Sequence, residues 1–99
     1  MTRYNKKTDT NHLVIKMALI QCNYITWDMS ACGFGVPDLL VLSKAGEFVF
    51  LEVKTAKGRL TKPEQKFFDT FYNARCYIVR SAEQAIEIMQ MCDCEKTKP

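Results

Sequence analysis

The stretch EFVFLEVK, residues 47–54, looks like a strand buried in a protein core. Its aromatic and β-branched residues are typical of a strand that is covered on both faces. Side chains alternate along a strand, so Glu52 and Lys54 share a face. A buried strand rarely ends on a carboxylate and an ammonium, because charged groups are more stable in solvent. Glu52 and Lys54 are therefore candidates for a functional site.

A hairpin brings a second carboxylate to this strand end. Residues 38–42 (DLLVL) read as a strand that turns at residues 44–46 (KAG) into EFVFLEVK. A three-residue loop with glycine in the left-handed position would place Asp38 opposite Glu52. A two-residue Ala-Gly loop would place Asp38 opposite Val53, but its first position needs a positive φ, which suits alanine poorly. We expect the longer loop, with two carboxylates and one ammonium converging at one end of a sheet.

The remaining pattern alternates between helix and strand signals. A helix is predicted from Asp9 or Thr10 to about Gln21, with Leu13, Met17 and Ile20 along one apolar stripe and Val14 and Ala18 beside it. The sequence further predicts strands at about 24–29, 38–42 and 47–54, a helix at 62–73, a strand at 76–79 and a helix at 82–91.

Two capping boxes mark the starts of the last two helices. Thr61 is followed three residues later by Glu64, with a proline between them, and Ser81 stands in the same relation to Gln84. The strand–helix–strand step between residues 48 and 79 indicates a parallel crossover. Both faces of the hairpin are apolar, so helices should cover at least part of each side.

The fold class that follows is α/β, with a mixed sheet flanked by helices in the order αβββαβα. Ninety-nine residues, 47% of them apolar, suit a single domain over 1–99, because two domains would each bury too little surface. Loose polar tails are expected at about 1–8 and 93–99.

Composition narrows the function class only slightly. A net charge of +3 permits a nucleic-acid partner without requiring one. The N-terminus lacks an apolar signal region, and the apolar stretch LVIKMALI is interrupted by lysine, so we expect a soluble, cytoplasmic protein with no membrane segment. Five cysteines without CxxC spacing favour reduced thiols over disulfides or a zinc site, although Cys92 and Cys94 leave a weak metal-binding alternative.

Two adjacent carboxylates raise one another's pKa unless a cation lies between them, and such hard oxygen ligands suit Mg²⁺ or Mn²⁺. A divalent ion there can activate water and neutralise charge on a phosphate, while Lys54 can orient the attacking water. The alternative is that Glu52 and Lys54 frame a solvated strand end and that Asp38 caps a turn after Pro37. The adjacent Pro-Asp pair and the basic loop that follows favour the catalytic interpretation.

Residues 55–62 (TAKGRLTK), here called the cation loop, carry Lys57, Arg59 and Lys62 around a flexible glycine. Cations of this kind, together with the N-terminus of the following helix, can hold a phosphate backbone. An ordinary solvated loop is the alternative.

Five short blocks together resemble a known family. They are GVPDL (35–39), LEVK (51–54), GRLT (58–61), EQ (64–65) and VRS (79–81), and the likeness that they carry runs from about residue 9 to residue 89, nearly the whole chain. In this order they are similar to the virus-type replication-repair nuclease (VRR-NUC) domain, a branch of the PD-(D/E)XK nuclease superfamily. The resemblance implies a restriction-endonuclease-like PD-(D/E)XK core, whose element order is similar to the one predicted above.

The resemblance also implies roles for single residues. Asp38 and Glu52 are expected to bind Mg²⁺ or Mn²⁺ with the Val53 backbone carbonyl as a further ligand. Lys54 is expected to serve the catalytic water, and Gln65 to support the site from the next helix.

Many family members also have a glutamate on the first helix, which this chain lacks. Asp9, Asn11 or His12 could replace it as a metal ligand, so the number of metal ions stays open. The alternative for His12 is a surface or capping role near the helix start.

Free-standing family members look like homodimeric endonucleases that cut four-way (Holliday) junctions. The resemblance therefore implies a phage or bacterial DNA endonuclease acting on branched DNA in replication, repair or recombination, with Lys57, Arg59, Lys62 and Arg80 binding DNA. A junction-binding module without catalysis, or a nuclease for linear DNA or RNA, are the alternatives. Trp27, Met29 and Phe34 are candidates for exposed apolar contacts, with core burial as the alternative.

Overall fold

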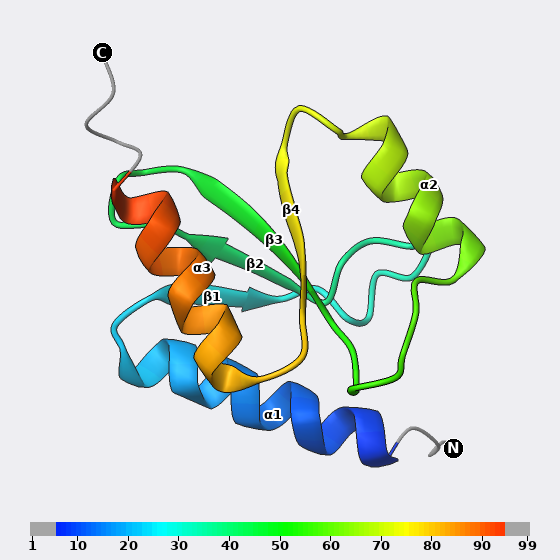
Figure 1. Ribbon diagram of the computed structural model, residues 1–99, viewed down its shortest axis with the longest axis horizontal. Coiled ribbons are helices and arrows are strands. Elements are labelled where there is room, and N and C mark those ends of the chain that lie inside the picture. Colours follow the sequence, from blue (N-terminus) through cyan, green and yellow to red (C-terminus); the bar gives the residue numbers. More distant parts are fainter. Residues whose placement is uncertain (1–5, 95–99) are drawn as a thin grey trace.

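The computed structural model describes the backbone of residues 6–94 and the side chains of residues 10–94. Three helices and a four-stranded sheet follow one another in the predicted αβββαβα order (Figure 1). Their bounds are α1 Lys6–Gln21, β1 Ile25–Asp28, β2 Leu39–Leu42, β3 Phe48–Val53, α2 Lys62–Thr70, β4 Arg75–Val79 and α3 Ala82–Cys94. None of the described helices is long and apolar enough to cross a membrane.

The sheet is mixed, as predicted. The strands lie in the order β1-β2-β3-β4, with antiparallel pairing among the first three and parallel pairing between β3 and β4. Helix α2 forms the connection between the parallel pair, which confirms the predicted parallel crossover.

The register of the β2–β3 hairpin is the predicted one. Leu39 pairs with Leu51, so continuing the ladder by one residue places Asp38 opposite Glu52. The turn has three residues, because the Ser43 N–H donates to the Glu47 carbonyl at 2.8 Å across residues 44–46. Its last residue is a glycine with a φ of +88°, a value that disfavours residues with a side chain.

Helices α1 and α3 cover one face of the sheet (Figure 1). Ile15 and Leu19 of α1 are fully buried there. The apolar stripe predicted from the sequence is not the buried face of α1, because Leu13, Met17 and Ile20 are 44–55% exposed. Apolar residues occupy nearly every position of LVIKMALI, so the pattern alone does not select a face. The packing of α1 against α3 and β1 makes that selection.

The other face of the sheet is covered only in part. The Phe67 ring of α2 meets the Phe50 ring edge-on, with a centroid distance of 5.4 Å. Ile25, Trp27 and Phe48 lie on this face and are 63–67% exposed. The prediction that helices cover at least part of both faces is confirmed, with α2 giving the smaller cover.

The strand ends lie within one residue of their predicted positions, whereas three helix ends differ by about three residues or more. Helix α1 begins at Lys6 and α3 continues to Cys94, so both extend into the segments expected to be loose tails; residues 1–5 and 95–99 lie outside the described part. Asp93 accepts hydrogen bonds from Tyr24 Oη at 2.6 Å and Lys44 N at 2.7 Å, which anchors the end of α3. Helix α2 ends at Thr70, earlier than the predicted 73, because the next residue leaves helical backbone angles.

Candidate active site

The predicted convergence at the end of β3 is present as a cavity of about 450 Å³. Its walls come from the end of β3, the residue before β2, the cation loop and the start of α2. The lining residues are Asp38, Glu52, Val53, Lys54, Thr55, Gly58, Arg59, Thr61 and Glu64.

Asp38 is fixed against β3 by the backbone of that strand. The Val53 N–H donates to Asp38 Oδ2 at 2.9 Å. Burial raises the pKa of Asp38, although the Val53 N–H and the nearby His12 act in the opposite direction. The hairpin register and this hydrogen bond together hold the Asp38 carboxylate at the end of β3 beside Glu52.

Glu52 is the most deeply buried acid at the site, with 2% of its surface exposed. Its Oε2 lies 3.4 Å from Lys54 Nζ, whereas its Oε1 is buried without a hydrogen-bond partner. Burial, and then the neighbouring charge of Asp38, raise the pKa of Glu52 to about 9. A buried acceptor left without a partner costs about 1–3 kcal/mol, so an unfilled position of this kind calls for a functional explanation.

Lys54 lies between two carboxylates. Its Nζ is 2.8 Å from Glu64 Oε1 and 3.4 Å from Glu52 Oε2. Burial alone would lower the pKa of Lys54, but the hydrogen bond to Glu64 and the charge of Glu52 outweigh it and raise the pKa. Lys54 is therefore a protonated donor held in place at the cavity wall.

Glu64 is the site residue that the sequence interpretation missed. It was predicted as half of a capping box and as part of the EQ block, with no role at the site. The capping box is present: Thr61 N donates to Glu64 Oε1 at 2.8 Å, and Glu64 N donates to Thr61 Oγ1 at 3.4 Å. The same Oε1 accepts from Lys54, so one carboxylate oxygen both caps α2 and orients the site lysine. Burial raises the pKa of Glu64, but the hydrogen bonds from Lys54 and Thr61 have the larger, opposite effect. The pKa of Glu64 is therefore lowered.

Gln65 lies on another side of α2. Its side chain is exposed, and Nε2 donates to Asp69 Oδ1 at 2.9 Å on the next turn. Neighbouring helix positions point about 100° apart, so Glu64 and Gln65 cannot both face the cavity. The structure brings Glu64 to the site and does not bring Gln65 there.

The first helix contacts the site from its edge. Asn11 Nδ2 donates to the Lys54 carbonyl at 3.0 Å, and His12 Nε2 lies 3.1 Å from Asp28 Oδ2. Neither residue lines the cavity. The side chain of Asp9 lies outside the described part of the chain.

Asp28, at the end of β1, is the centre of a second polar cluster that sequence patterns did not indicate. Its Oδ2 is 3.1 Å from both His12 Nε2 and Lys16 Nζ. Its Oδ1 accepts hydrogen bonds from the backbone N–H and the hydroxyl of Ser30 at 2.9 and 2.6 Å. Burial opposes the change, but the Ser30 and Lys16 hydrogen bonds lower the pKa of Asp28 well below its usual range.

Three of the four predicted DNA-contacting cations project into solvent. Lys57, Arg59 and Lys62 are exposed, and Arg59 also lines the cavity. Arg80 has a different position, because its Nη1 donates to the carbonyls of Thr55 and Gly58 at 2.7 Å each. The Arg80 guanidinium therefore fixes the shape of the cation loop.

The donor set at the cavity fits a hard divalent cation. Glu52 offers the unpartnered Oε1, Asp38 offers a second carboxylate, and Val53 also lines the cavity. Among side chains 10–94, no three histidine, cysteine or acidic groups are already arranged to hold a metal together. Two carboxylates completed by carbonyl, water or phosphate oxygens suit Mg²⁺ or Mn²⁺, which usually retain several waters in proteins.

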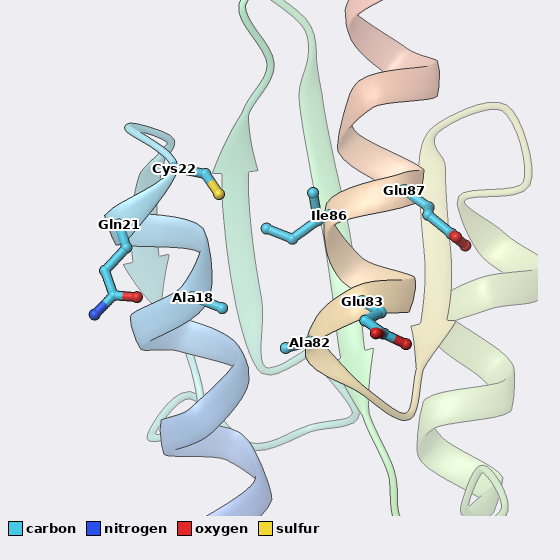
Figure 2. Close-up of a pocket in the computed structure, with 7 residues that line it drawn as sticks. All are labelled: Ala18, Gln21, Cys22, Ala82, Glu83, Ile86 and Glu87. Carbon is cyan, nitrogen blue, oxygen red and sulfur yellow. The ribbon is translucent and has the colours of Figure 1, made fainter.

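A groove of about 540 Å³ lies elsewhere, between α1 and α3 (Figure 2). Ala18 and Cys22 face Ala82 and Ile86 across it. Figure 2 shows the carboxylates of α3 that border the groove pointing away from α1. This groove gathers no convergent polar groups and is not a candidate for chemistry.

Comparison with known proteins gives one match. The family model described as the VRR-NUC domain matches residues 5–83 of the 99-residue chain. The matched region contains Asp38, Glu52, Lys54 and the cation loop. Neither the curated proteins nor the solved structures yield a match to this chain.

Proposed function

The chain belongs to the VRR-NUC domain family and is thus a nuclease-type domain acting on DNA, and on this premise we propose that it is a Mg²⁺- or Mn²⁺-dependent endonuclease that hydrolyses phosphodiester bonds. The observation that supports this proposal most directly is Glu52 Oε1, which is buried beside Asp38 with no hydrogen-bond partner. A divalent cation would supply the missing contact and offset the repulsion between the two carboxylates.

In this proposal, Asp38, Glu52 and the Val53 carbonyl hold the metal ion. When bound, the ion supplies an activated water and neutralises charge on the reacting phosphate. Lys54 donates a hydrogen bond toward the attacking water or the developing negative charge, and Glu64 keeps its ammonium aligned at 2.8 Å. Gln65 is assigned no contact with the reacting groups.

The DNA backbone would lie along the cation loop. Lys57, Arg59 and Lys62 are exposed on the segment that borders the cavity, and they can neutralise phosphates without reading base sequence. Arg80 contributes indirectly, because its bonds to the loop carbonyls keep these cations beside the site.

We further propose that the substrate is branched DNA, such as a four-way junction, and that the active form is a homodimer. The sheet face that carries Ile25, Trp27 and Phe48 is apolar, largely exposed and continuous with the face on which Glu52 emerges. A two-fold dimer through this face would present two active sites to two symmetric strands.

The homodimer is tested by sedimentation equilibrium of the wild type and of Trp27→Lys. The variant should shift the chain to monomers, whereas Leu13→Lys, on the exposed face of α1 across the sheet, should not. A wild type that remains monomeric at micromolar concentrations would contradict the dimer.

The nuclease activity is tested with linear, flapped and four-way DNA of equal length, in Mg²⁺, in Mn²⁺ and with chelator. We expect metal-dependent cleavage that is fastest on the four-way substrate. Binding without cleavage in either metal would instead favour a junction-binding module. Equal cleavage of linear and branched DNA would remove the structure selectivity but leave the nuclease.

A further inference from the structure

Phe34 is an aromatic residue in an unusual position. Its side chain is 95% exposed, and its φ is +58°, a left-handed value that is uncommon for residues other than glycine. Gly33 and Gly35 on either side also have positive φ values of 71° and 80°. A strained backbone that presents a large apolar group to solvent indicates a functional contact outside the chain itself.

The loop that carries Phe34 is packed against the start of α2. A Cβ atom on Gly35 would lie 2.3 Å from the Pro63 carbonyl oxygen, so a side chain there is excluded and the two backbones are in contact. Figure 1 shows this loop, between β1 and β2, running beside α2. The position of Phe34 is therefore set by the contact between the loop and the helix.

Beside Phe34 lies an apolar groove of about 340 Å³. Two further aromatic rings form part of its wall, those of Phe67 and Phe71, with centroids 4.5 Å apart. Lys66 and Thr70 complete the wall, whose surface is almost entirely apolar. The full lining is Phe34, Pro63, Lys66, Phe67, Thr70 and Phe71.

Both walls of the groove are connected directly to the candidate active site. On the helix side, Pro63 precedes Glu64, which binds Lys54. On the loop side, Phe34 lies four residues before Asp38. The groove and the cavity are therefore lined by neighbouring residues of the same two segments, the loop before β2 and the start of α2.

We propose that this groove receives one unstacked nucleobase of the bound DNA, with Phe34 stacking on its face. The proposal rests on the proposed function for the presence of DNA. Every base has a π-face, so stacking on aromatic side chains does not depend on sequence, and it favours DNA whose bases are already unpaired or easily unstacked. Phe34 would then contribute to the preference for branch points.

A nucleobase fits this groove better than a second copy of the chain or an apolar peptide does. A nucleobase brings a phosphate with it, and Lys66, with Lys62 one turn earlier on α2, supplies cations on the same helix. A volume of about 340 Å³ also lies at the small end of ligand-binding cavities, which suits a single planar group.

The test is a double-mutant cycle that combines a substitution at Phe34 with the removal of single bases from the DNA, with the binding affinity measured in Ca²⁺. Each nucleotide around the branch of a four-way substrate is replaced in turn by an abasic analogue. For the wild type, removal of one particular base should weaken binding about tenfold, within the range measured for base–aromatic stacking. For Phe34→Ala, which should bind the intact junction about tenfold more weakly, removal of the same base should have little further effect.

Two variants control for indirect effects. Phe34→Trp should restore the response to base removal. Tyr72→Ala removes an aromatic ring that is 78% exposed just past the end of α2 but does not line the groove, and it should respond as the wild type does. Because the Phe34 side chain is exposed, Phe34→Ala should have the melting temperature of the wild type. Phe34→Gly should have a higher melting temperature, because glycine adopts a positive φ without strain.

Each contrary result overturns a defined part of the account. Binding that is equally sensitive to base removal in the wild type and in Phe34→Ala would overturn the base groove while leaving the nuclease. A loss of self-association in Phe34→Ala, with no base dependence in either protein, would assign the groove to a second copy of the chain and also overturn it. Absence of any DNA binding by the wild type would overturn the proposed function itself.

Discussion

Two carboxylates of this protein, Asp28 and Glu52, lie near cations but differ in whether both of their oxygens have hydrogen-bond or ion-pair partners. Asp28 is exposed, and both of its oxygens have partners, with His12 and Lys16 on one and Ser30 on the other. Glu52 is buried, has one cation at 3.4 Å and leaves Oε1 without a partner. Their pKa values accordingly move in opposite directions, downward for Asp28 and upward for Glu52.

This difference separates a structural cluster from a candidate active site. The Asp28 cluster is complete within the chain and joins α1 to β1. The Glu52 cluster is incomplete, which raises the free energy of the folded state unless a proton or a metal ion is bound. The following predictions test that distinction.

The largest expected effect is on catalysis. Glu52→Gln and Lys54→Ala should each lower the rate of DNA cleavage by about a hundredfold or more, the scale for removing a preorganised electrostatic group, while junction binding is retained. Asp28→Asn should change the rate by no more than about threefold, because its partners lie outside the cavity. Single-turnover cleavage with parallel binding measurements checks this, and equal losses in all three variants would erase the distinction.

The contact between Gly35 and the Pro63 carbonyl places the start of α2 at the site. Gly35→Ala should destabilise the protein by about 1–3 kcal/mol more than Gly33→Ala, because the new methyl group would overlap the Pro63 carbonyl. Gly33 has a similar positive φ but open space around it, so it isolates the backbone strain common to both variants. Urea unfolding measures both. Equal destabilisation would mean that the loop and α2 are not in close contact.

The two carboxylates should also give stability changes of opposite sign with pH. Glu52 has a folded-state pKa of about 9, above its ordinary 4.5, so the folded chain retains a proton that the unfolded chain has released between these values. Stability of the metal-free wild type should therefore fall as pH rises through this window. Glu52→Gln should remove this fall and be about 1–3 kcal/mol more stable than the wild type at pH 8.

Asp28 provides the contrast. Its pKa is lowered from 3.8, so its contribution is present above that value and is lost as pH falls below it. Asp28→Asn should destabilise the protein near neutral pH by less than about 1 kcal/mol, since the ion pairs are partly solvated. Unfolding in chelator across pH 3–9 tests both carboxylates, and parallel pH curves for the two variants would contradict their different assignments.

The smallest expected effect comes from the cap of α2. Thr61→Ala removes the hydroxyl that accepts from Glu64 N and should destabilise the protein by about 1 kcal/mol. Thr61→Ser keeps that acceptor and should be near wild type. Thermal unfolding of both variants measures the effect, and equal losses would show that the hydroxyl is not the stabilising group.

The hairpin of the site could be predicted from sequence because its physical determinants are local. Turn length follows from the need for glycine at a positive φ, and turn length then fixes the opposition of Asp38 and Glu52. The capping box at Thr61 and Glu64 was predicted for the same reason, since its two hydrogen bonds span only three residues.

Features that depend on tertiary packing could not be predicted in this way. The buried stripe of α1 runs through Ile15 and Leu19, whereas a helix with apolar residues on most sides gives no periodic signal to identify it. Whether Glu64 or Gln65 faces the cavity depends on the rotation of α2 about its axis. Arg80 looks like a DNA contact in the sequence, and only the fold brings it to the carbonyls of the cation loop.

Metal binding by the intact chain tests the central claim most directly. Titration of the wild type with Mn²⁺ in a calorimeter at pH 8 should show binding accompanied by proton release, because the ion displaces the proton that Glu52 retains. Asp28→Asn should bind Mn²⁺ as the wild type does, and Glu52→Gln should not bind it measurably. Equal Mn²⁺ affinity in the wild type and Glu52→Gln would contradict the assignment of Glu52 as a metal ligand.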